Sequence, residues 1–471
     1  MNSKSMNQAK SKKTLKFGTD GWRAKIADEF TLANVQLVTQ AFVNYLKDSG
    51  KDKKGVIVGY DNRFESEDFA RASAEVCSGA GIKTYLTKHS VPSPVISFTV
   101  KNRGLGAGIM ITASHNPPDW NGFKIKEDFG GSARPETTKA VENNLKDTLS
   151  ISPSDSNLEL IDPDPDYLGK IKSLVHLDLI KKSKLKFMID PMFGSGAGYF
   201  KKLGLPVTEI RGRRDPLFGG INPEPIPANL EEPISYIKDN QEHIACIILD
   251  GDADRLAAID QTGQFINTHN VFELLLHHLI VHRKLSGNIV KTFNLSNLID
   301  KMCMKHKRKL MVTPIGFKYI AEKMINEDIL LGGEESGGMG IKGFVPERDG
   351  ILAGLMLMEL MATEKKTLSQ IIDGFMGEHG YFYYDRADLH TEKARDIVIK
   401  LKEAPPKKFA NKKVSNVDVL DGLKLNFENN SWILFRASGT EPLLRVYVEG
   451  RSENEVKELL AAGEDLAAPT T

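Results

Sequence analysis

The sequence predicts an α/β protein with mostly parallel sheets, divided into four segments. Short apolar, β-branched runs alternate with longer amphipathic stretches along most of the 471 residues. Such alternation is typical of strand–helix–strand units, in which ligands bind beyond the carboxyl ends of the strands. Several polar motifs directly follow apolar runs, so the sequence also predicts where functional loops lie in each unit.

The predicted elements follow one another in this pattern from the first segment onward. The predictions are a strand over 54–61, a helix over 69–81, a strand over 82–88, and a strand running into a loop over 106–117. Ser66 is the candidate N-cap of the helix predicted over 69–81. The alternation recurs over 185–200, 244–256 and 289–306.

Three changes in composition indicate segment boundaries. Residues 150–168 are rich in Pro, Asp and Ser and predict a linker, 257–265 predict a turn before an apolar helix, and 377–390 pass from a helical pattern to an aromatic strand. The domains expected from these changes are residues 1–160, 161–262, 263–378 and 379–471, the last being the shortest.

Composition excludes several classes of protein. There are 63 Lys and Arg against 62 Asp and Glu, a net charge of +1, so no global field favours nucleic acid or an anionic membrane. No apolar run approaches the ~18 residues that span a bilayer. Three cysteines without a CxxC pair support neither a disulfide scaffold nor a thiolate zinc site. The polar N-terminus lacks a signal-peptide core, so a cytoplasmic location is expected.

The first chemical motif is ITASHNPPDWNGFK, residues 111–124. A loop presents Ser114 beside His115, which could act as its base, and Lys124 could close back on the same site. A polar turn with a solvated serine is the alternative. No GxSxG elbow surrounds the serine, which counts against a hydrolase triad.

The second motif is DGDADR, residues 250–255, after the apolar run IACIIL. Asp250, Asp252 and Asp254 alternate, so in an extended backbone their side chains share a face. Three converging carboxylates repel one another unless a cation intervenes, and an oxygen-only donor set favours Mg²⁺ over Zn²⁺. An EF-hand is excluded because Arg255 and Gln261 replace its Gly and Glu. An acidic solvated turn is the alternative.

Two further loops carry polar groups suited to a sugar phosphate. GEESGG presents Glu334 and Ser336 among glycines, which suits hydrogen bonds to sugar hydroxyls, although a flexible turn explains it equally well. RASGTEPLLR combines hydroxyls, backbone N–H groups and guanidinium forks, the chemistry of a phosphate cradle; a plain β-turn is the alternative. Its candidates are Arg436, Ser438, Gly439, Thr440 and Arg445.

Three weaker features complete the set. FGTDGWRA places Arg23 after a Gly/Asp turn. GSGAG at 194–198 lacks the third glycine of a dinucleotide-binding loop and predicts a tight strand-to-helix connection. RGRR at 211–214 is too short for nucleic acid and predicts a solvated surface.

Five of these motifs together resemble the α-D-phosphohexomutase superfamily. FGTDGWR, TASHNP with NGFK, DGDADR, GEESGG and RASGTEP occur in the family's order, and the resemblance extends from about Phe17 to Gly450. It implies a four-domain, heart-shaped enzyme with a central cleft. Three domains would be related α/β units, and the fourth a smaller α+β unit.

The resemblance also implies a mechanism. Ser114 would be a phosphoserine that donates its phosphoryl group to a hexose phosphate, giving a 1,6-bisphosphate that turns around and returns its other phosphate. Glucose 1,6-bisphosphate would be the activator. Mg²⁺ would be held by the Ser114 phosphate and the three aspartates of DGDADR, with Arg23 and Arg255 adding positive charge. Lys124 would be the general acid/base, with His115 as the alternative.

Substrate contacts are implied as well. Glu334 and Ser336 would bind sugar hydroxyls, and Lys291 in the strand-like IVKT would touch the substrate. The phosphate that is not reacting would lie against Arg436, Ser438, Gly439, Thr440 and Arg445. TPIGFKYI resembles the G-W-K loop of phosphoglucomutases, with Phe317 in place of Trp, so Gly316 and Lys318 are further candidates.

These details favour a phosphoglucomutase, because GEES and the Gly316 loop look like the glucose-specific form. NPPDWNGFK looks instead like the dual phosphomannomutase/phosphoglucomutase enzymes, so dual activity is an alternative, as is a phosphoglucosamine mutase. A non-catalytic sugar-phosphate-binding relative would be expected to lose the serine or a metal aspartate, and all are present here. The expected partner is a hexose phosphate, and the expected assembly a monomer or homodimer.

Overall fold

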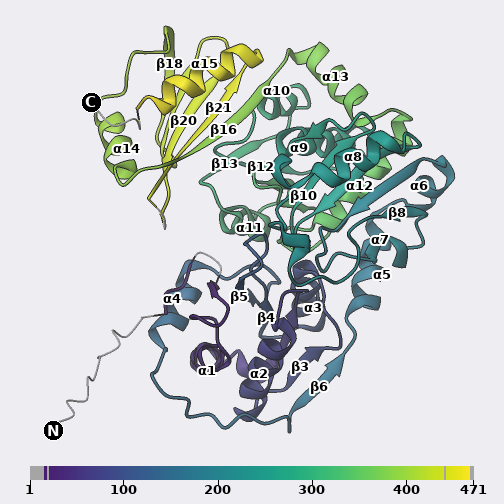
Figure 1. The fold of residues 1–471 in the computed structure, drawn as a ribbon, viewed down its shortest axis with the longest axis vertical. Coiled ribbons are helices and arrows are strands. Elements are labelled where there is room, and N and C mark those ends of the chain that lie inside the picture. The colour runs from purple at the N-terminus through teal and green to yellow at the C-terminus, as the bar shows by residue number, and fades with distance from the viewer. Residues whose placement is uncertain (1–14, 19–20, 440–441, 467–471) are drawn as a thin grey trace, which may run out of the picture.

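Four sheets organise the chain, one in each of four successive units. The computed structural model describes residues 15–18, 21–439 and 442–466. The units follow a curved path, from the purple first unit through the teal second and third units to the yellow fourth unit (Figure 1). Three α/β units and a smaller α+β unit confirm the predicted fold class. Among the described residues, no helix has the length and apolarity needed to cross a membrane.

The first unit contains a six-stranded sheet in the order β1-β5-β4-β2-β3-β6. Its central strands are parallel, whereas β5 runs antiparallel to both β4 and β1. The elements are β1 Gly21–Lys25, α1 Leu32–Asp48, β2 Val56–Tyr60, α2 Ser66–Gly79, β3 Thr84–Thr87, α3 Ser93–Arg103, β4 Ala107–Ile111, β5 Trp120–Glu127, α4 Pro135–Asn143 and β6 Leu158–Ile161.

Strand β2 shows why this apolar run forms a central strand. Val56 and Val58 belong to the apolar cluster built with α1 and α2, whereas Ile57 belongs to the cluster that contains α3. Alternate side chains of a strand point to opposite faces, so a continuous apolar run is buried on both. The helices therefore cover both faces of the sheet.

The second and third units repeat this design. Their sheets have the orders β11-β10-β9-β7-β8 and β13-β12-β14-β15, each with parallel strands and an antiparallel edge. The second unit's elements are α5 Asp164–Leu174, α6 Leu177–Ser183, β7 Lys186–Asp190, α7 Tyr199–Lys202, β8 Val207–Glu209, α8 Glu231–Asp239, β9 His243–Leu249, β10 Leu256–Asp260 and β11 Phe265–Ile266.

The third unit also contains a π-helical turn, η4 His278–His282, directly after its first helix. Its other elements are α9 Thr268–His277, β12 Asn288–Thr292, α10 Leu298–Lys305, β13 Leu310–Thr313, α11 Phe317–Asn326, β14 Ile329–Gly333, β15 Met339–Ile341, α12 Gly350–Glu364 and α13 Leu368–His379. The buried helix α12 packs on β9 and β10 of the second sheet as well as on α9, so the two units share one core.

The fourth unit is an antiparallel sheet, in the order β16-β21-β20-β19-β18-β17, with two helices against it. Its elements are β16 Tyr383–His390, α14 Ala394–Glu403, β17 Lys408–Phe409, β18 Lys412–Asp418, β19 Leu423–Phe427, β20 Trp432–Ala437, β21 Leu443–Gly450 and α15 Glu453–Glu464. It has its own apolar core, and a small cluster containing Phe293 and Trp432 joins it to the third unit.

The four main motifs occupy equivalent positions in the four sheets. The Ser114 loop joins β4 to β5, the aspartate loop joins β9 to β10, and the Glu334 loop joins β14 to β15. In each case the loop leaves a parallel strand and enters its antiparallel neighbour. The Ser438 loop likewise joins the antiparallel strands β20 and β21.

Three local predictions were wrong. The expected linker 150–168 contains strand β6, which pairs with β3, and the start of α5. Ser66 is not the N-cap of α2: Glu65 holds that position, and the Ser66 hydroxyl donates to Asp61. In RGRR, predicted to be a solvated surface, Arg211 is buried and paired with Asp190, whereas Arg213 and Arg214 are exposed. The boundaries 1–160, 161–262, 263–378 and 379–471 remain a prediction.

Candidate active site

One cleft is lined by residues of all four units. Its volume is about 530 Å³, and the first to fourth units contribute His115, Arg255, Glu334 and Arg445, among others. The motifs that contain these residues are far apart in sequence but end at the same cavity. The cleft is therefore where a ligand could contact every unit at once.

Ser114, whose neighbour His115 lines the cleft, has an unusual backbone conformation. Its φ is +54°, in the left-handed region that costs a non-glycine residue about 1 kcal/mol or more. Its hydroxyl donates to Asp250 Oδ2 at 2.7 Å, and its backbone N–H donates to Thr112 Oγ1 at 2.9 Å. The strained turn thus aims the serine oxygen at the aspartate loop.

Arg63 holds the serine loop in this shape. The fully buried guanidinium donates to four backbone carbonyls, those of Ser114 at 2.6 Å, Asn116 at 2.7 Å, Pro117 at 2.7 Å and Trp120 at 3.0 Å. A planar fork of five N–H donors is suited to organising several acceptors at once. The strain at Ser114 is therefore balanced by a ring of charge-assisted hydrogen bonds.

The three aspartates of the second unit converge as the sequence predicts. Asp250, Asp252 and Asp254 are buried and each offers a carboxylate oxygen within 4.8 Å of the others. The Oδ1 atoms of Asp252 and Asp254 are buried without a hydrogen-bond partner among the described residues. Buried unpaired carboxylate oxygens are costly, and a divalent cation would satisfy them. The donor set therefore fits a hard metal ion.

The charges around the aspartates are unequal. Burial and the neighbouring carboxylates of Asp252 and Asp254 raise the pKa of Asp250 well above its usual range. Burial also acts to raise the pKa of Asp252, but the Lys124 ammonium outweighs it and holds that pKa low. Arg348 does the same for Asp254. Lys124, Arg348 and Arg255 thus place three positive charges around the three carboxylates.

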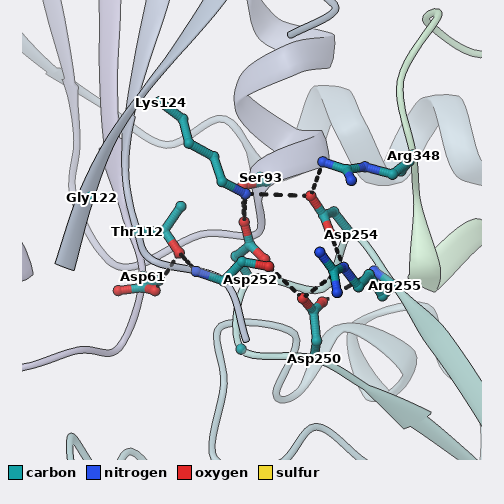
Figure 2. Close-up of polar contacts among 12 residues, drawn as sticks. Asp61, Ser93, Thr112, Gly122, Lys124, Asp250, Asp252, Asp254, Arg255 and Arg348 are labelled. Atoms are coloured by element: carbon teal, nitrogen blue, oxygen red, sulfur yellow. Dashed lines mark hydrogen bonds and ion pairs between the residues drawn. The ribbon is translucent and has the colours of Figure 1, made fainter. Parts of the chain in front are cut away.

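Lys124 and Arg348 approach the aspartates from two other units. Lys124 Nζ, on β5, lies 2.7 Å from Asp252 Oδ2 and 3.4 Å from Asp254 Oδ2, and Arg348 Nη2 lies 2.8 Å from the latter. Figure 2 shows both cations pointing at the carboxylates, with Arg255 beside Asp250 and Asp254. Three units therefore meet at the aspartate loop.

His115 and Arg23 flank the serine loop. Burial, with the charges of Arg255, Arg23 and Lys124, lowers the pKa of His115 well below its ordinary value, so the ring is neutral at neutral pH. Arg23 Nη1 donates to Asn116 Oδ1 at 2.9 Å. The structure thus brings both predicted residues next to the predicted phosphoryl carrier.

The third unit contributes a row of acceptors and a hydroxyl to the cleft. Glu334 and Ser336 both line it, as predicted, and Glu334 accepts from Arg348 at 2.9 Å. Glu335 also lines it and accepts from the Tyr384 hydroxyl at 2.8 Å and from Arg386 at 3.4 Å. Glu335 therefore links the third unit to the fourth across the cleft.

The predicted phosphate cradle is a pair of arginines on adjacent strands. Arg436 and Arg445 are directly paired across β20 and β21; Arg436 lies 3.1 Å from Asp421 and Arg445 lies 3.8 Å from Asp388. Two neighbouring guanidiniums repel each other unless anions lie near them, and a phosphate is such an anion.

The turn beyond these strands carries the other cradle candidates. Ser438 is buried and its backbone N–H donates to the Leu443 carbonyl at 2.8 Å, while the carbonyl of Gly439 accepts from Arg395 at 3.2 Å. Thr440 lies outside the described residues.

Six predicted substrate contacts among the described residues do not line the cleft, namely Lys291, Gly316, Lys318, Arg436, Ser438 and Gly439. Lys291 donates to the Ser296 carbonyl at 2.9 Å, pairs with Asp300 and lines a separate cavity, and its contact with the substrate remains a prediction. Gly316 precedes α11, and its neighbour Ile315 lines the cleft. Lys318 lies over the ring of Tyr319 at 5.1 Å.

The structure adds residues that the motif analysis missed, above all Arg63, Ser93, Glu335 and Arg348. Ser93 donates to Asp252 through its hydroxyl. Arg63 belongs to the segment YDNR, which begins at the last residue of β2. Inspection of the polar residues that follow this strand would have identified it. Arg348 follows a loop and carries no comparable signal.

Comparison with known proteins assigns the class. The chain matches all four domains of the phosphoglucomutase/phosphomannomutase family: domain I over residues 14–151, domain II over 165–263, domain III over 267–379 and the C-terminal domain over 398–465. The chain belongs to this family of phosphohexomutases, which are isomerases.

Individual relatives span nearly the whole chain. A phosphoglucomutase/phosphomannomutase of Thermococcus kodakarensis is 30% identical over 95% of this chain and 97% of its own. A phosphoglucosamine/phosphogalactosamine mutase of Sulfurisphaera tokodaii is 29% identical over 94% of this chain and 97% of its own. The solved structure of a Thermus thermophilus protein assigned as a phosphomannomutase superposes with a TM-score of 0.87 at 34% identity, covering 96% of this chain and 99% of that one.

Proposed function

We propose that the protein interconverts hexose 1-phosphate and hexose 6-phosphate through a phosphoserine at Ser114 and a hexose 1,6-bisphosphate intermediate. One observation carries this proposal: the Ser114 hydroxyl lies 2.7 Å from Asp250 of the aspartate triad, and His115 and Arg255, from the same two loops, line the cleft shared by all four units. Phosphoryl transfer depends mainly on positioning and charge neutralisation, and this arrangement supplies both.

The metal of the proposed site is Mg²⁺, held by Asp250, Asp252, Asp254 and the Ser114 phosphate. When bound, Mg²⁺ neutralises charge on the transferring phosphoryl group. A relative of Aspergillus fumigatus, an N-acetylphosphoglucosamine mutase with a TM-score of 0.59 and 16% identity, was solved with its sugar phosphate and magnesium. Arg23 and Arg255 would add positive charge, since Arg255 lies beside Asp250 and Asp254 and Arg23 donates to Asn116 of the serine loop.

The proton of the attacking sugar hydroxyl requires an acceptor, and Lys124 is the proposed one. Its Nζ is buried between the first and second units, 2.7 Å from Asp252 and 3.4 Å from Asp254, so Lys124 would take up the hydroxyl proton as the neutral amine and become the ammonium that these carboxylates stabilise. His115 is the second candidate, because its ring is neutral and lines the cleft. A general base has to be unprotonated at the working pH, and His115 meets this condition directly.

The remaining cleft residues orient the sugar phosphate. Glu334 and Ser336 would bind sugar hydroxyls, while Arg436 and Arg445 would hold the phosphate that is not reacting. Ser438 and Gly439 supply a hydroxyl and backbone groups to the same cradle. Asp421 pairs with Arg436 and also accepts the backbone N–H of Ile315, so the cradle is tied to the loop that contains Gly316 and leads into α11, where Lys318 lies.

We propose glucose as the preferred sugar, because GEES and the Gly316 loop resemble the glucose-specific form. The relatives named above act on several hexose phosphates, so the experiment compares substrates. Turnover of glucose 1-phosphate, mannose 1-phosphate and glucosamine 1-phosphate is measured with Mg²⁺ and catalytic glucose 1,6-bisphosphate. We expect the highest kcat/KM for glucose 1-phosphate. A higher value for glucosamine or mannose 1-phosphate overturns only the sugar assignment, whereas turnover of none overturns the mutase proposal.

Arg63→Lys tests whether the buried guanidinium positions the phosphoserine loop. One ammonium cannot replace a fork that serves four carbonyls, and hydrogen bonds to charged groups are worth about 1.5–3 kcal/mol each. Since misplacing a reacting group by about 1 Å costs on the order of 10²-fold, we expect kcat to fall ten- to a hundredfold. KM and circular dichroism should change little.

The matched control is Arg71→Lys, the same substitution at an exposed arginine of α2 whose partner Glu75 lies 4.0 Å away. Comparing the steady-state kinetics of the two variants distinguishes an effect of loop positioning from a general effect of replacing an arginine by lysine. A wild-type kcat in Arg63→Lys would contradict the positioning role.

A further inference from the structure

A second cluster of metal-type ligands lies outside the cleft, in the third unit. It consists of His277, His282 and Glu364, whose ligand atoms lie within 4.8 Å of one another. Both imidazoles approach the same carboxylate oxygen: Glu364 Oε1 lies 3.2 Å from His277 Nε2 and 2.9 Å from His282 Nε2. Three ligand atoms of two chemical types therefore converge on one point.

The backbone is built to bring the two imidazoles together. His277 ends α9, and His282 ends the π-helical turn η4 that follows it. In an α-helix, residues five apart point about 140° away from each other. In the π-helical turn the Arg283 N–H donates to the His278 carbonyl at 3.0 Å, so residues five apart lie on the same side of the helix. The ring centroids of His277 and His282 are therefore only 5.1 Å apart. Such π-helical insertions occur frequently at functional sites.

We propose that His277, His282 and Glu364 bind a zinc-type divalent cation. Tetrahedral coordination at about 2.05 Å places neighbouring ligand atoms about 3.3 Å apart, close to both observed nitrogen–oxygen separations. Imidazole nitrogen with one carboxylate suits Zn²⁺, whereas the oxygen-only triad of the cleft suits Mg²⁺. Each of the three side chains is about one-fifth exposed, which leaves a fourth position open to water.

Local charges favour occupancy. Glu364 places a carboxylate beside the two imidazoles, and a carboxylate is the anionic ligand that offsets the charge of a divalent cation. Lys366 donates to the other carboxylate oxygen at 3.0 Å and leaves Oε1 to face the imidazoles.

The position of the site suggests what it stabilises. Helices α9 and α12 pack together, and Figure 1 shows them side by side in the third unit. Helix α9 begins at Thr268, which lines the cleft, and α12 begins just after Arg348, which contacts Asp254. The proposed site joins the far ends of these two helices. A bound ion would therefore hold these two helices together at a point outside the cleft, and both helices position the wall of the cleft.

Zinc titration of the full-length protein tests the proposal, with saturating Mg²⁺ present to occupy the cleft. We expect one Zn²⁺ per chain by calorimetry, and a Co²⁺ derivative with the intense visible bands of tetrahedral coordination. Glu364→Gln and His282→Gln should each lower zinc affinity at least about tenfold and abolish those bands. Both variants keep side chains of similar size, and circular dichroism verifies their fold.

His89→Ala is the matched control, since His89 is another exposed imidazole facing carboxylates, 3.3 Å from Asp162 and 3.7 Å from Asp164. It should leave zinc affinity unchanged. Zinc should also raise Tm in the wild type but not in Glu364→Gln. Absence of zinc binding in the wild type, or binding that is lost in His89→Ala but kept in Glu364→Gln, would overturn the site.

Discussion

Ser114→Ala is expected to lower mutase activity by on the order of 10³-fold or more while the fold survives. The hydroxyl that carries the phosphoryl group is lost, and the Ser93 hydroxyl, which donates to Asp252, belongs to α3 and not to the serine loop. Intact-mass measurement of the wild type should show a fraction heavier by one phosphoryl group, which Ser114→Ala lacks.

Ser173→Ala is the control for this experiment, because Ser173 is an exposed serine on the surface of α5 whose hydroxyl contacts only the Lys170 carbonyl among the described groups. It should retain both full activity and the phosphorylated fraction. Near-normal turnover by Ser114→Ala would disprove the phosphoserine mechanism, whatever the substrate preference.

Removal of the metal is the second large effect. We expect EDTA to abolish activity and Mg²⁺ to restore it, because the orphaned oxygens of Asp252 and Asp254 require a cation. Asp252→Asn should lower kcat by about a hundredfold or more and change KM far less, since the ion matters most as charge shifts in the transition state. Kinetics at several Mg²⁺ concentrations measure both quantities.

Asp178→Asn, at an exposed position of α6, carries the same change of charge away from the cleft and should leave kcat and the Mg²⁺ dependence as in the wild type. Full activity of EDTA-treated wild-type protein would show that the aspartate triad is not a metal site. Loss of activity in Asp178→Asn as well would show that net charge, rather than coordination, is responsible.

The sequence alone was sufficient for the class of fold and for the convergence of the three aspartates. Strand β2 illustrates the first: an apolar run that is buried on both faces can be recognised from its residues. The DGDADR loop illustrates the second, because alternating carboxylates after a buried strand have few other uses. Both patterns lie within a short segment, so they can be recognised without knowledge of the rest of the chain.

Features that depend on contacts elsewhere in the chain were not predicted from the sequence. The 150–168 segment has the composition of a linker, but its strand β6 is specified by pairing with β3, which lies about 70 residues away. Lys291 follows the family pattern in sequence, but packing of the third unit turns its ammonium to Asp300. Composition and motif similarity do not record which partner a side chain finds.

Only the tertiary structure decided how the four loops form one site. Arg63 is 51 positions from Ser114 in the chain and Arg348 is 94 from Asp254, yet each guanidinium lies within 3 Å of the group it serves. In sequence both resemble solvated surface arginines. Their roles arise because burial strengthens charged contacts and because three units pack against one loop, and neither condition is encoded in any short segment. The sequence by itself determined which chemistry the loops carry, and the packing of the units decided which residues aim them.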